Sequence, residues 1–277
     1  MASYMEIYQA VILGILQGVT EFLPVSSSGH LVLGQLFFGI TESSLAFNIS
    51  VHMGTLGAVA LVYFADIKGM VVSVLAGMAK TIKRQPVVVE SDTHLKLALF
   101  IVAGSVPTAF IGMGLKKFED VLFTSGMLVG AMLLVTGTIL WISRGFYRTE
   151  KTGTPLDLKR SLLIGISQGL AVIPGISRAG TTIACGMFCG LDRQTAAKFS
   201  FLLSIPAILG AEMISVLESL DQGLQIDATV IYGTLTAFVS GLMALKLLIK
   251  LVHAGKFHLF APYCWVLGVL VLVLTIV

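Results

Sequence analysis

The chain has 277 residues, of which 56% are hydrophobic and 12% are charged, and its formal net charge is +3. Soluble globular proteins carry about 25% charged residues, so this composition excludes an ordinary soluble domain and predicts a polytopic membrane protein with one compact domain. No basic stripe interleaved with aromatic residues is present, which argues against nucleic acid as a partner. No basic segment precedes the first apolar run, which argues against a cleavable signal peptide.

The first apolar segment, at 7–40, contains the stretch Gln17-Gly-Val-Thr-Glu-Phe-Leu-Pro-Val-Ser-Ser-Ser-Gly-His30. An ionisable group at the centre of a bilayer costs about 2.5–3.5 kcal/mol, so Glu21 indicates a functional site. Pro24 and Gly29 interrupt the helix around it. Irregular backbone at membrane depth is tolerated only where protein or a wet cavity surrounds it, so we expect a re-entrant helix-loop-helix hairpin here.

Six further apolar segments have about the 20 residues that a 30 Å hydrocarbon core requires. They lie at 45–64, 95–115, 121–142, 197–217, 228–249 and 258–277. The basic connection 65–94 is expected to contain an interfacial helix at 69–79, and a second re-entrant hairpin is expected at 161–192. The predicted fold class is therefore an all-α polytopic membrane protein with six transmembrane helices and two re-entrant hairpins.

An internal repeat relates the two hairpins. Gly14–Gly29 aligns without a gap on Gly165–Gly180, and six of the sixteen positions are identical. Average composition gives about one or two matches over this length. The polar stretch 143–160 then separates a first repeat, 1–142, from a second repeat, 161–277.

The number of spans predicts that the repeats are inverted. Three spans in each half give the halves opposite orientations, and inverted repeats place their site near the midplane where broken helices meet, so we expect the hairpin tips to face each other. The basic connections 65–94, 143–160 and 250–257 fall on one side, which the positive-inside rule makes cytoplasmic. The other side carries the acidic residues Glu119, Asp120, Glu218, Asp221 and Asp227.

The first tip combines groups suited to phosphate chemistry. Gln17 and Glu21 share one helical face, and their oxygens suit a hard divalent cation or a catalytic proton. Ser26 and Ser27 lie near the start of the returning helix, where free N–H groups favour an anion. His30 follows one turn after Ser27 and could serve as base, acid or nucleophile.

The second tip, at 174–182, carries Arg178 at the position aligned with Ser27. A guanidinium binds phosphate through two parallel donors. The two tips together predict a site for phosphoryl transfer, in which positioning and charge stabilisation do most of the catalysis. A secondary transporter or flippase for an anionic or phosphorylated lipid is the alternative, but a transporter needs no pair of nucleophile and base such as Ser27 and His30.

Both tips, Gln17-x-x-x-Glu21 with Pro-Val-Ser-Ser-Ser-Gly-His30 and Pro174-Gly-Ile-Ser-Arg178-Ala-Gly-Thr-Thr182, resemble the two signature regions of the bacterial undecaprenyl-diphosphate phosphatase family, the bacitracin-resistance type. The resemblance covers essentially the whole chain. It implies a multi-pass enzyme of the bacterial inner (cytoplasmic) membrane that removes the terminal phosphate of undecaprenyl diphosphate. The products are undecaprenyl phosphate, recycled as the lipid carrier for cell-wall synthesis, and inorganic phosphate. The resemblance further implies a divalent cation, Mg²⁺ or Ca²⁺, and a site that opens to the periplasmic or outer face.

Roles for individual residues follow from the same resemblance. It implies Glu21 as the essential acidic residue and metal ligand, Ser27 and His30 as nucleophile or base, and Arg178 as the cation that binds the diphosphate. Substrate contacts are implied for Gln17, Ser26, Gly29, Ser177, Gly180 and Thr182. This chain departs from the family pattern in Gln17, where many relatives have Glu, and in Ala179, where Ser is common. The sequence leaves open whether Ser27, His30 or water attacks, which metal is used, and whether the chain forms a homodimer.

Other polar residues in the apolar segments have two interpretations. Asn48 and His52 lie four residues apart on one span and could line the cavity or form hydrogen bonds in the core. Glu212 could mark the wet side of the site or the outer interface. Cys185 and Cys189 are interpreted as packing residues rather than metal ligands. With Cys264 they make three cysteines and no disulfide framework.

Overall fold

The computed structural model describes residues 5–40, 45–118, 122, 125–147, 152–218 and 227–276, and every regular element in these ranges is a helix. The prediction of an all-helical chain with six segments able to span a membrane is confirmed. These are Leu45–Val62, Thr93–Lys116, Gly126–Phe146, Arg193–Glu218, Ala228–His253 and Phe257–Thr275. Glu119, Asp120 and Asp221, used above to assign the outer face, lie outside the described residues.

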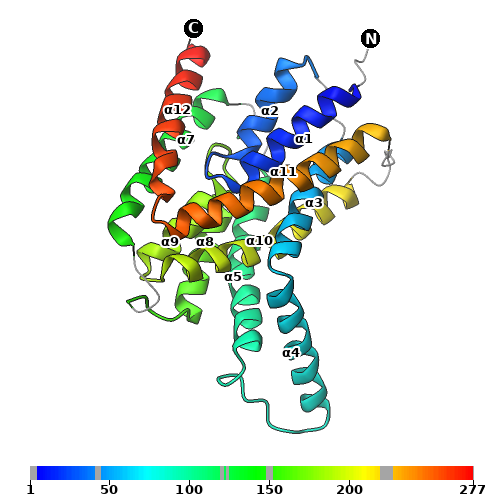
Figure 1. Cartoon of the computed structure of the whole chain (residues 1–277), viewed down its shortest axis with the longest axis vertical. Coiled ribbons are helices and arrows are strands. Elements are labelled where there is room, and N and C mark those ends of the chain that lie inside the picture. The colour runs from blue at the N-terminus through cyan, green and yellow to red at the C-terminus, as the bar shows by residue number, and fades with distance from the viewer. Residues whose placement is uncertain are drawn as a thin grey trace.

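Both expected hairpins are present as pairs of helices joined by a tight turn. The first consists of α1 (Ile7–Phe22) and α2 (Ser27–Phe37), and the second consists of α8 (Leu158–Leu170) and α9 (Arg178–Phe188). In Figure 1 the turn of the first hairpin lies in the middle of the molecule, close to α9. That the hairpins return within the bilayer, and that the repeats are inverted, remain predictions.

The connection after α3 (Leu45–Val62) forms a longer helix than expected. The helix predicted at 69–79 is α4 (Phe64–Ile82), which begins almost directly after α3 and contains no buried residue. Asp66 in its first turn and Lys80 in its last turn match the helix dipole, which extends the helix at both ends. Together with the first turns of α5 (Thr93–Lys116), α4 projects from the rest of the molecule as an arm (Figure 1).

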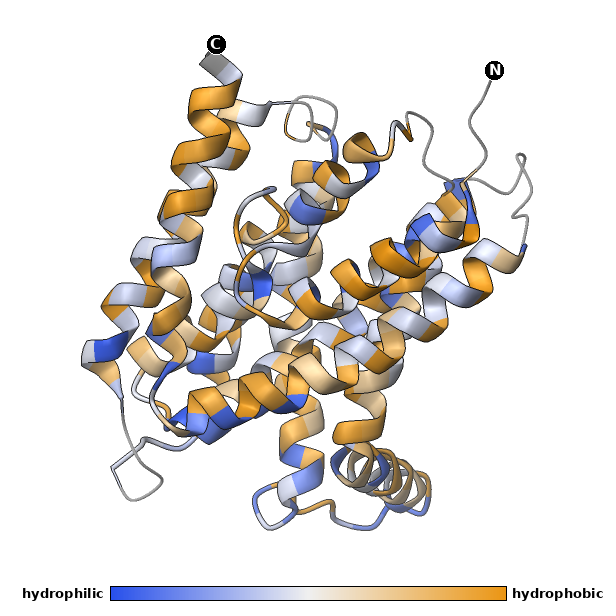
Figure 2. Ribbon diagram, turned by 45° about the horizontal axis from the view of Figure 1, so that its top comes forward, coloured by the Kyte–Doolittle hydropathy of each residue, from blue (hydrophilic) through white to orange (hydrophobic). Residues whose placement is uncertain are grey.

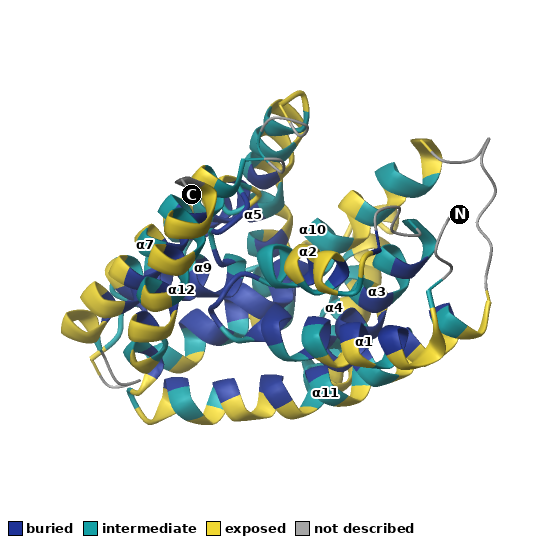
Figure 3. Ribbon diagram, turned by 90° about the horizontal axis from the view of Figure 1, so that it is seen from above, coloured by how far each residue is buried: buried dark blue, intermediate teal, exposed yellow. Residues whose placement is uncertain are grey.

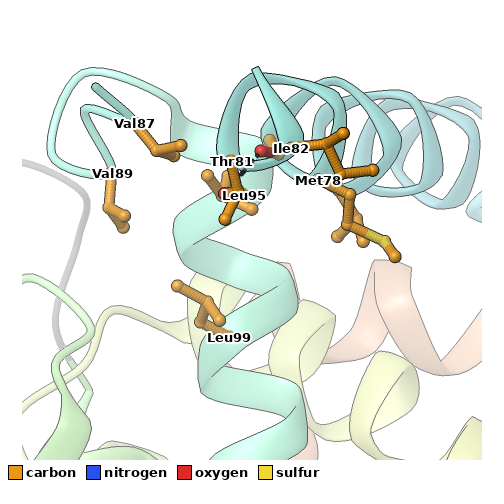
Figure 4. A pocket seen from close by; sticks show the side chains of 9 residues that line it. Met78, Thr81, Ile82, Val87, Val89, Leu95 and Leu99 are labelled. Atoms are coloured by element: carbon orange, nitrogen blue, oxygen red, sulfur yellow. Dashed lines mark hydrogen bonds between the residues drawn. The ribbon is translucent and has the colours of Figure 1, made fainter. Parts of the chain in front are cut away.

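A cavity of about 450 Å³ lies within this arm (Figure 4). It is apolar, and none of the predicted site residues lines it. Its walls come from α4, the connection to α5 and the first turns of α5, through Val74, Gly77, Met78, Thr81, Ile82, Val87, Val89, Leu95 and Leu99.

The remaining helices are α7 (Gly126–Ser143), α10 (Arg193–Glu218), α11 (Ala228–His253) and α12 (Ala261–Ile276). Helix α1 packs along α11, and α8 packs along α5. Each hairpin therefore packs on a span from the other half of the chain. The helix backbones touch at glycines, as small residues in membrane helices allow.

The tightest of these backbone contacts show how little room is left. A Cβ atom on Gly18 of α1 would lie 2.6 Å from the carbonyl oxygen of Ala237 in α11. A Cβ atom on Gly165 of α8 would lie 2.0 Å from the carbonyl oxygen of Gly104 in α5. Neither position accepts a larger residue without moving the helices apart.

The buried core surrounds the turns of the two hairpins. Phe22, at the end of α1, stacks edge to face on Phe201 of α10, and both are fully buried. Figure 3 shows the buried residues gathered in the interior, whereas most outward faces are exposed. Figure 2 shows that hydrophobic residues cover long stretches of these helices. Such outward apolar surface suits contact with lipid.

Candidate active site

The carboxylate of Glu21 lies at the centre of the site. Glu21 is in the last turn of α1 and is only 8% exposed. Its Oε2 atom accepts hydrogen bonds from the Ser27 hydroxyl at 2.6 Å and from the Gln17 amide at 3.0 Å. Its Oε1 atom accepts one from the guanidinium of Arg178 at 2.6 Å. The expectation that the tips face each other is met in these contacts, which join residues of both tips in one cluster.

Backbone geometry brings the tips together. Ser26 has a φ of 71°, and its hydroxyl accepts a hydrogen bond from the Gly175 amide at 3.2 Å. Gly175 has a φ of 93°, and a Cβ atom there would lie 2.5 Å from the Val129 carbonyl oxygen. Only glycine fits this turn, because both the positive φ and the close approach exclude a side chain. Gly180 is similarly confined, since a Cβ atom added there would lie 3.2 Å from the Cβ atom of Pro24.

The hydroxyls of the second tip serve bonds within the protein. Ser177 caps α9 by accepting a hydrogen bond from the Gly180 amide at 3.1 Å. Thr182 donates to the Arg178 carbonyl at 2.8 Å and shares a hydrogen bond with Ser200. Both residues are buried. They fix the start of α9 and therefore the position of Arg178, while their contact with substrate remains a prediction.

Both ring nitrogens of His30 have partners other than Ser27. Its Nδ1 atom is 2.8 Å from the Ser26 carbonyl oxygen, and its Nε2 atom is 2.7 Å from the Tyr263 hydroxyl. The Ser27 hydroxyl is bonded to Glu21 and not to His30. Gly29, one residue earlier, has room for a methyl group, because a Cβ atom would lie 3.6 Å from its nearest neighbour.

Sequence reasoning missed Tyr263. It lies 233 residues from its partner and belongs to the apolar helix α12, in which no neighbouring polar residue or repeat position marks it. An aromatic residue in such a helix is usually explained by packing or by the membrane interface. Only the folded arrangement of α12 against the first tip reveals its contact.

A second pair of ionisable residues lies beside the cluster. The Nδ1 atom of His52 in α3 lies 3.1 Å from a carboxylate oxygen of Glu212 in α10, and the two side chains are 28% and 15% exposed. The sequence left His52 open between a cavity and a core role, and it left Glu212 open between the wet side of the site and the outer interface. The structure places them together in the interior between α3 and α10, next to the site.

The cluster offers few ligands for a metal ion. Within the residues that the structure describes, no three or more His, Cys, Asp or Glu side chains are grouped so that they could hold one. Glu21 supplies one carboxylate, and the Oε1 atom of Gln17 is buried without a hydrogen-bond partner. These two oxygens fit a Mg²⁺ ion that takes its remaining ligands from water and a diphosphate, as Mg²⁺ commonly does.

Comparison with known proteins agrees with these features. The family model described as bacitracin resistance protein BacA matches residues 10–270. An undecaprenyl-diphosphatase of Desulforapulum autotrophicum is 55% identical over 268 residues, which cover 96% of this chain and 97% of that protein. An undecaprenyl-diphosphatase of Desulfosudis oleivorans is 54% identical over 95% of this chain and 97% of that protein. Another, of Carboxydothermus hydrogenoformans, is 44% identical over 98% of each chain. The chain belongs to the BacA family of bacitracin resistance proteins.

Proposed function

We propose that this chain is an undecaprenyl-diphosphate phosphatase, which hydrolyses the terminal phosphate of the lipid to give undecaprenyl phosphate and inorganic phosphate. The observation that carries the proposal is the buried Glu21 carboxylate, which holds the Ser27 hydroxyl on one oxygen and the Arg178 guanidinium on the other. A nucleophile, its base and a phosphate-binding cation thus meet at one point. The names of the similar proteins support the same reaction, and the description of the family supports resistance to bacitracin. Recycling of the lipid carrier for cell-wall synthesis is part of the proposal.

Ser27 is the proposed nucleophile and Glu21 its base. The hydroxyl already donates to Glu21 at 2.6 Å, within the range for direct proton transfer. As the Ser27 oxygen bonds to the terminal phosphorus, Glu21 takes the hydroxyl proton. The bridging P–O bond breaks, and its electron pair leaves with undecaprenyl phosphate. Water then cleaves the phosphoserine, and Glu21 returns the proton to Ser27.

Arg178 is the proposed anchor for the diphosphate. One nitrogen of its guanidinium contacts Glu21, and its remaining donors can bind two phosphate oxygens in parallel. The cation balances the charge that develops on the departing phosphate, and it needs no reorganisation because α9 fixes it beforehand.

A divalent cation is part of the proposal, with Glu21 and Gln17 as the residues that would hold it. When bound, it would neutralise charge on the diphosphate oxygens. Gln17 also donates to Glu21 at 3.0 Å, so it orients the carboxylate toward Ser27.

The protein is a multi-pass membrane protein, and we propose that it lies in the inner membrane with the cluster accessible from the outer face. The orientation is supported by the basic residues at the end of the α4 arm, Lys80, Lys83 and Arg84, which the positive-inside rule assigns to the cytoplasm. Proteoliposomes with the lipid substrate presented on one side would test it, since only one orientation of the protein would then release phosphate.

The test of the activity is phosphate release by the purified protein from a polyprenyl diphosphate, with Mg²⁺ and with a chelator. Glu21→Gln and Arg178→Ala should each lower kcat/KM by about 100-fold or more, because each removes a charge that the reaction uses. Glu90→Gln, an exposed carboxylate in the connection between α4 and α5, is the control and should match the wild type. Wild-type protein that binds the lipid but releases no phosphate with any divalent cation would refute the phosphatase and favour a lipid transporter.

A further inference from the structure

The hydrogen bonds of His30 fix which of its nitrogens carries a proton. Nδ1 lies 2.8 Å from the Ser26 carbonyl oxygen, which can only accept, so Nδ1 must hold a hydrogen. In the neutral imidazole, Nε2 therefore has only a lone pair. That lone pair meets the Tyr263 hydroxyl at 2.7 Å, so the hydroxyl donates to it.

The ring of Tyr263 is held in place by its own helix. The next residue, Cys264, is fully buried, and its thiol donates to the Pro24 carbonyl oxygen at 3.3 Å. This contact fixes the first turn of α12 against the first tip. The Tyr263 ring then lies nearly parallel to that of His30, with centroids 5.9 Å apart and planes 15° from each other.

Glu21 already accepts the Ser27 hydroxyl, so the role of His30 in the proposed reaction is separate from activating Ser27. Resting on the proposed phosphatase reaction, we propose that Tyr263 is a positioning residue: its hydroxyl and ring hold the His30 imidazole in the single orientation in which His30 takes part in catalysis. Tyr263 is 48% exposed. Its hydroxyl can also accept a hydrogen bond, so the contact survives if His30 becomes charged during turnover.

The test is Tyr263→Phe, which keeps the ring and removes only the hydroxyl. We expect kcat to fall about tenfold, the equivalent of one lost hydrogen bond, with KM unchanged. Tyr232→Phe is the matched control, because Tyr232 is 47% exposed on α11 and lies outside the cluster. The control should keep wild-type kcat. Phosphate release by the wild type tests the reaction itself, so a failure of that reaction is distinguished from a failure of the role of Tyr263.

A double-mutant cycle with His30→Gln separates positioning from a merely structural role. If Tyr263 acts through His30, Tyr263→Phe costs nothing further once His30 is replaced. An equal loss in both backgrounds, or wild-type kcat in Tyr263→Phe, would overturn the proposal. Diethyl pyrocarbonate gives a second readout, because Nε2 of His30 should be modified faster in Tyr263→Phe than in the wild type. An unchanged rate of modification would contradict the contact.

Discussion

Two neighbouring hydroxyls in the first tip have different partners. Ser27 donates to Glu21 at 2.6 Å, whereas the Ser28 hydroxyl has only a long contact of 3.4 Å to the Ser26 hydroxyl. The difference follows from the start of α2, in which adjacent side chains point about 100° apart around the helix. Two residues of the same type therefore allow a test with a built-in control.

We expect Ser27→Ala to lower phosphate release by about 100-fold or more, because within the described residues Ser27 carries the hydroxyl that is bonded to the base. Ser28→Ala should stay within about threefold of the wild type, since it loses at most one weak hydrogen bond. A steady-state assay of phosphate release by both variants at equal expression measures the two losses. Equal losses in both would exclude Ser27 as the nucleophile, as would a Ser27→Ala variant with full activity.

Gln17 permits a test of the metal ligands. Replacing it by Glu turns the unpartnered amide oxygen into a second carboxylate, which binds a hard divalent cation more strongly. The Mg²⁺ concentration for half-maximal activity should therefore fall several-fold in Gln17→Glu. This concentration is measured by treating the protein with a chelator and then titrating its activity with Mg²⁺. A half-maximal concentration equal to or above that of the wild type would speak against this pair of oxygens as ligands.

The contacts of a single residue could be predicted from the sequence where that residue lies in a repeated motif. Glu21 and Arg178 were placed opposite each other because they lie in aligned copies of one motif, and the structure joins them. The partner of His30 could not be predicted, since Tyr263 comes from an apolar helix outside both motifs. Helical spacing placed His30 one turn after Ser27, but it could not show that the imidazole also binds the Ser26 carbonyl oxygen.

At the scale of elements, the hairpins depend on glycine contacts with their partner helices. Gly165→Ala would place a methyl group 2.0 Å from the Gly104 carbonyl oxygen and force α8 away from α5. We expect it to lower the thermal unfolding temperature by several degrees and to reduce activity, since α8 leads into the second tip. Gly114→Ala, in an open part of α5, is the control and should be neutral or slightly stabilising. Equal unfolding temperatures of the two variants would contradict the close packing.

The start of α11 provides a pH-dependent test. Hydrogen bonds from the Thr229 hydroxyl and the Val230 amide hold the pKa of the Asp227 carboxyl below its usual value. A lowered pKa means that this cap stabilises the fold above the pKa of the unfolded chain and is lost as the pH falls through the folded pKa. Asp227→Ala should cost about 1 kcal/mol at neutral pH and progressively less below pH ~4. Melting curves of the wild type and the variant at neutral pH and below pH ~4 measure this cost. A cost that does not change with pH would contradict the charged cap.

Element boundaries were predictable where hydropathy alone sets them. The six spans appear within a few residues of the expected ranges, because lipid imposes both length and apolarity on them. Helix α4 was underestimated, since its ends are set by charges in the first and last turns rather than by an apolar run. The arm it forms could not be foreseen, because it depends on where α5 begins after the connection.

At the scale of the whole molecule, the two halves are interleaved. The thiol of Cys264 donates a hydrogen bond to the Pro24 carbonyl oxygen, and the hydroxyl of Thr136 donates one to the Gly175 carbonyl oxygen at 2.9 Å. Pro24 and Gly175 occupy the same position in the aligned repeats. Equivalent carbonyls of the two tips are thus bound by the last helices of the two halves, α12 and α7, which supports the predicted repeat.

Interleaving predicts the behaviour of a divided chain. If the chain is cut between residues 150 and 151, neither fragment should be active alone, because each hairpin lacks the helix on which it packs. Both fragments expressed together should restore phosphate release and should copurify through a tag on one of them. Activity of a single fragment would contradict the exchange of hairpins between the halves.

The packing of α1 on α11 also has a consequence for biogenesis. Helix α1 leaves the ribosome first, but α11 extends to His253 and is among the last helices to be made. Until then the glycine face of α1 lacks its partner helix, and the carboxylate of Glu21 lacks Arg178 until α9 has been made. The catalytic centre therefore cannot be assembled during most of translation. The first hairpin is therefore without the helix on which it packs through almost the entire synthesis of the chain.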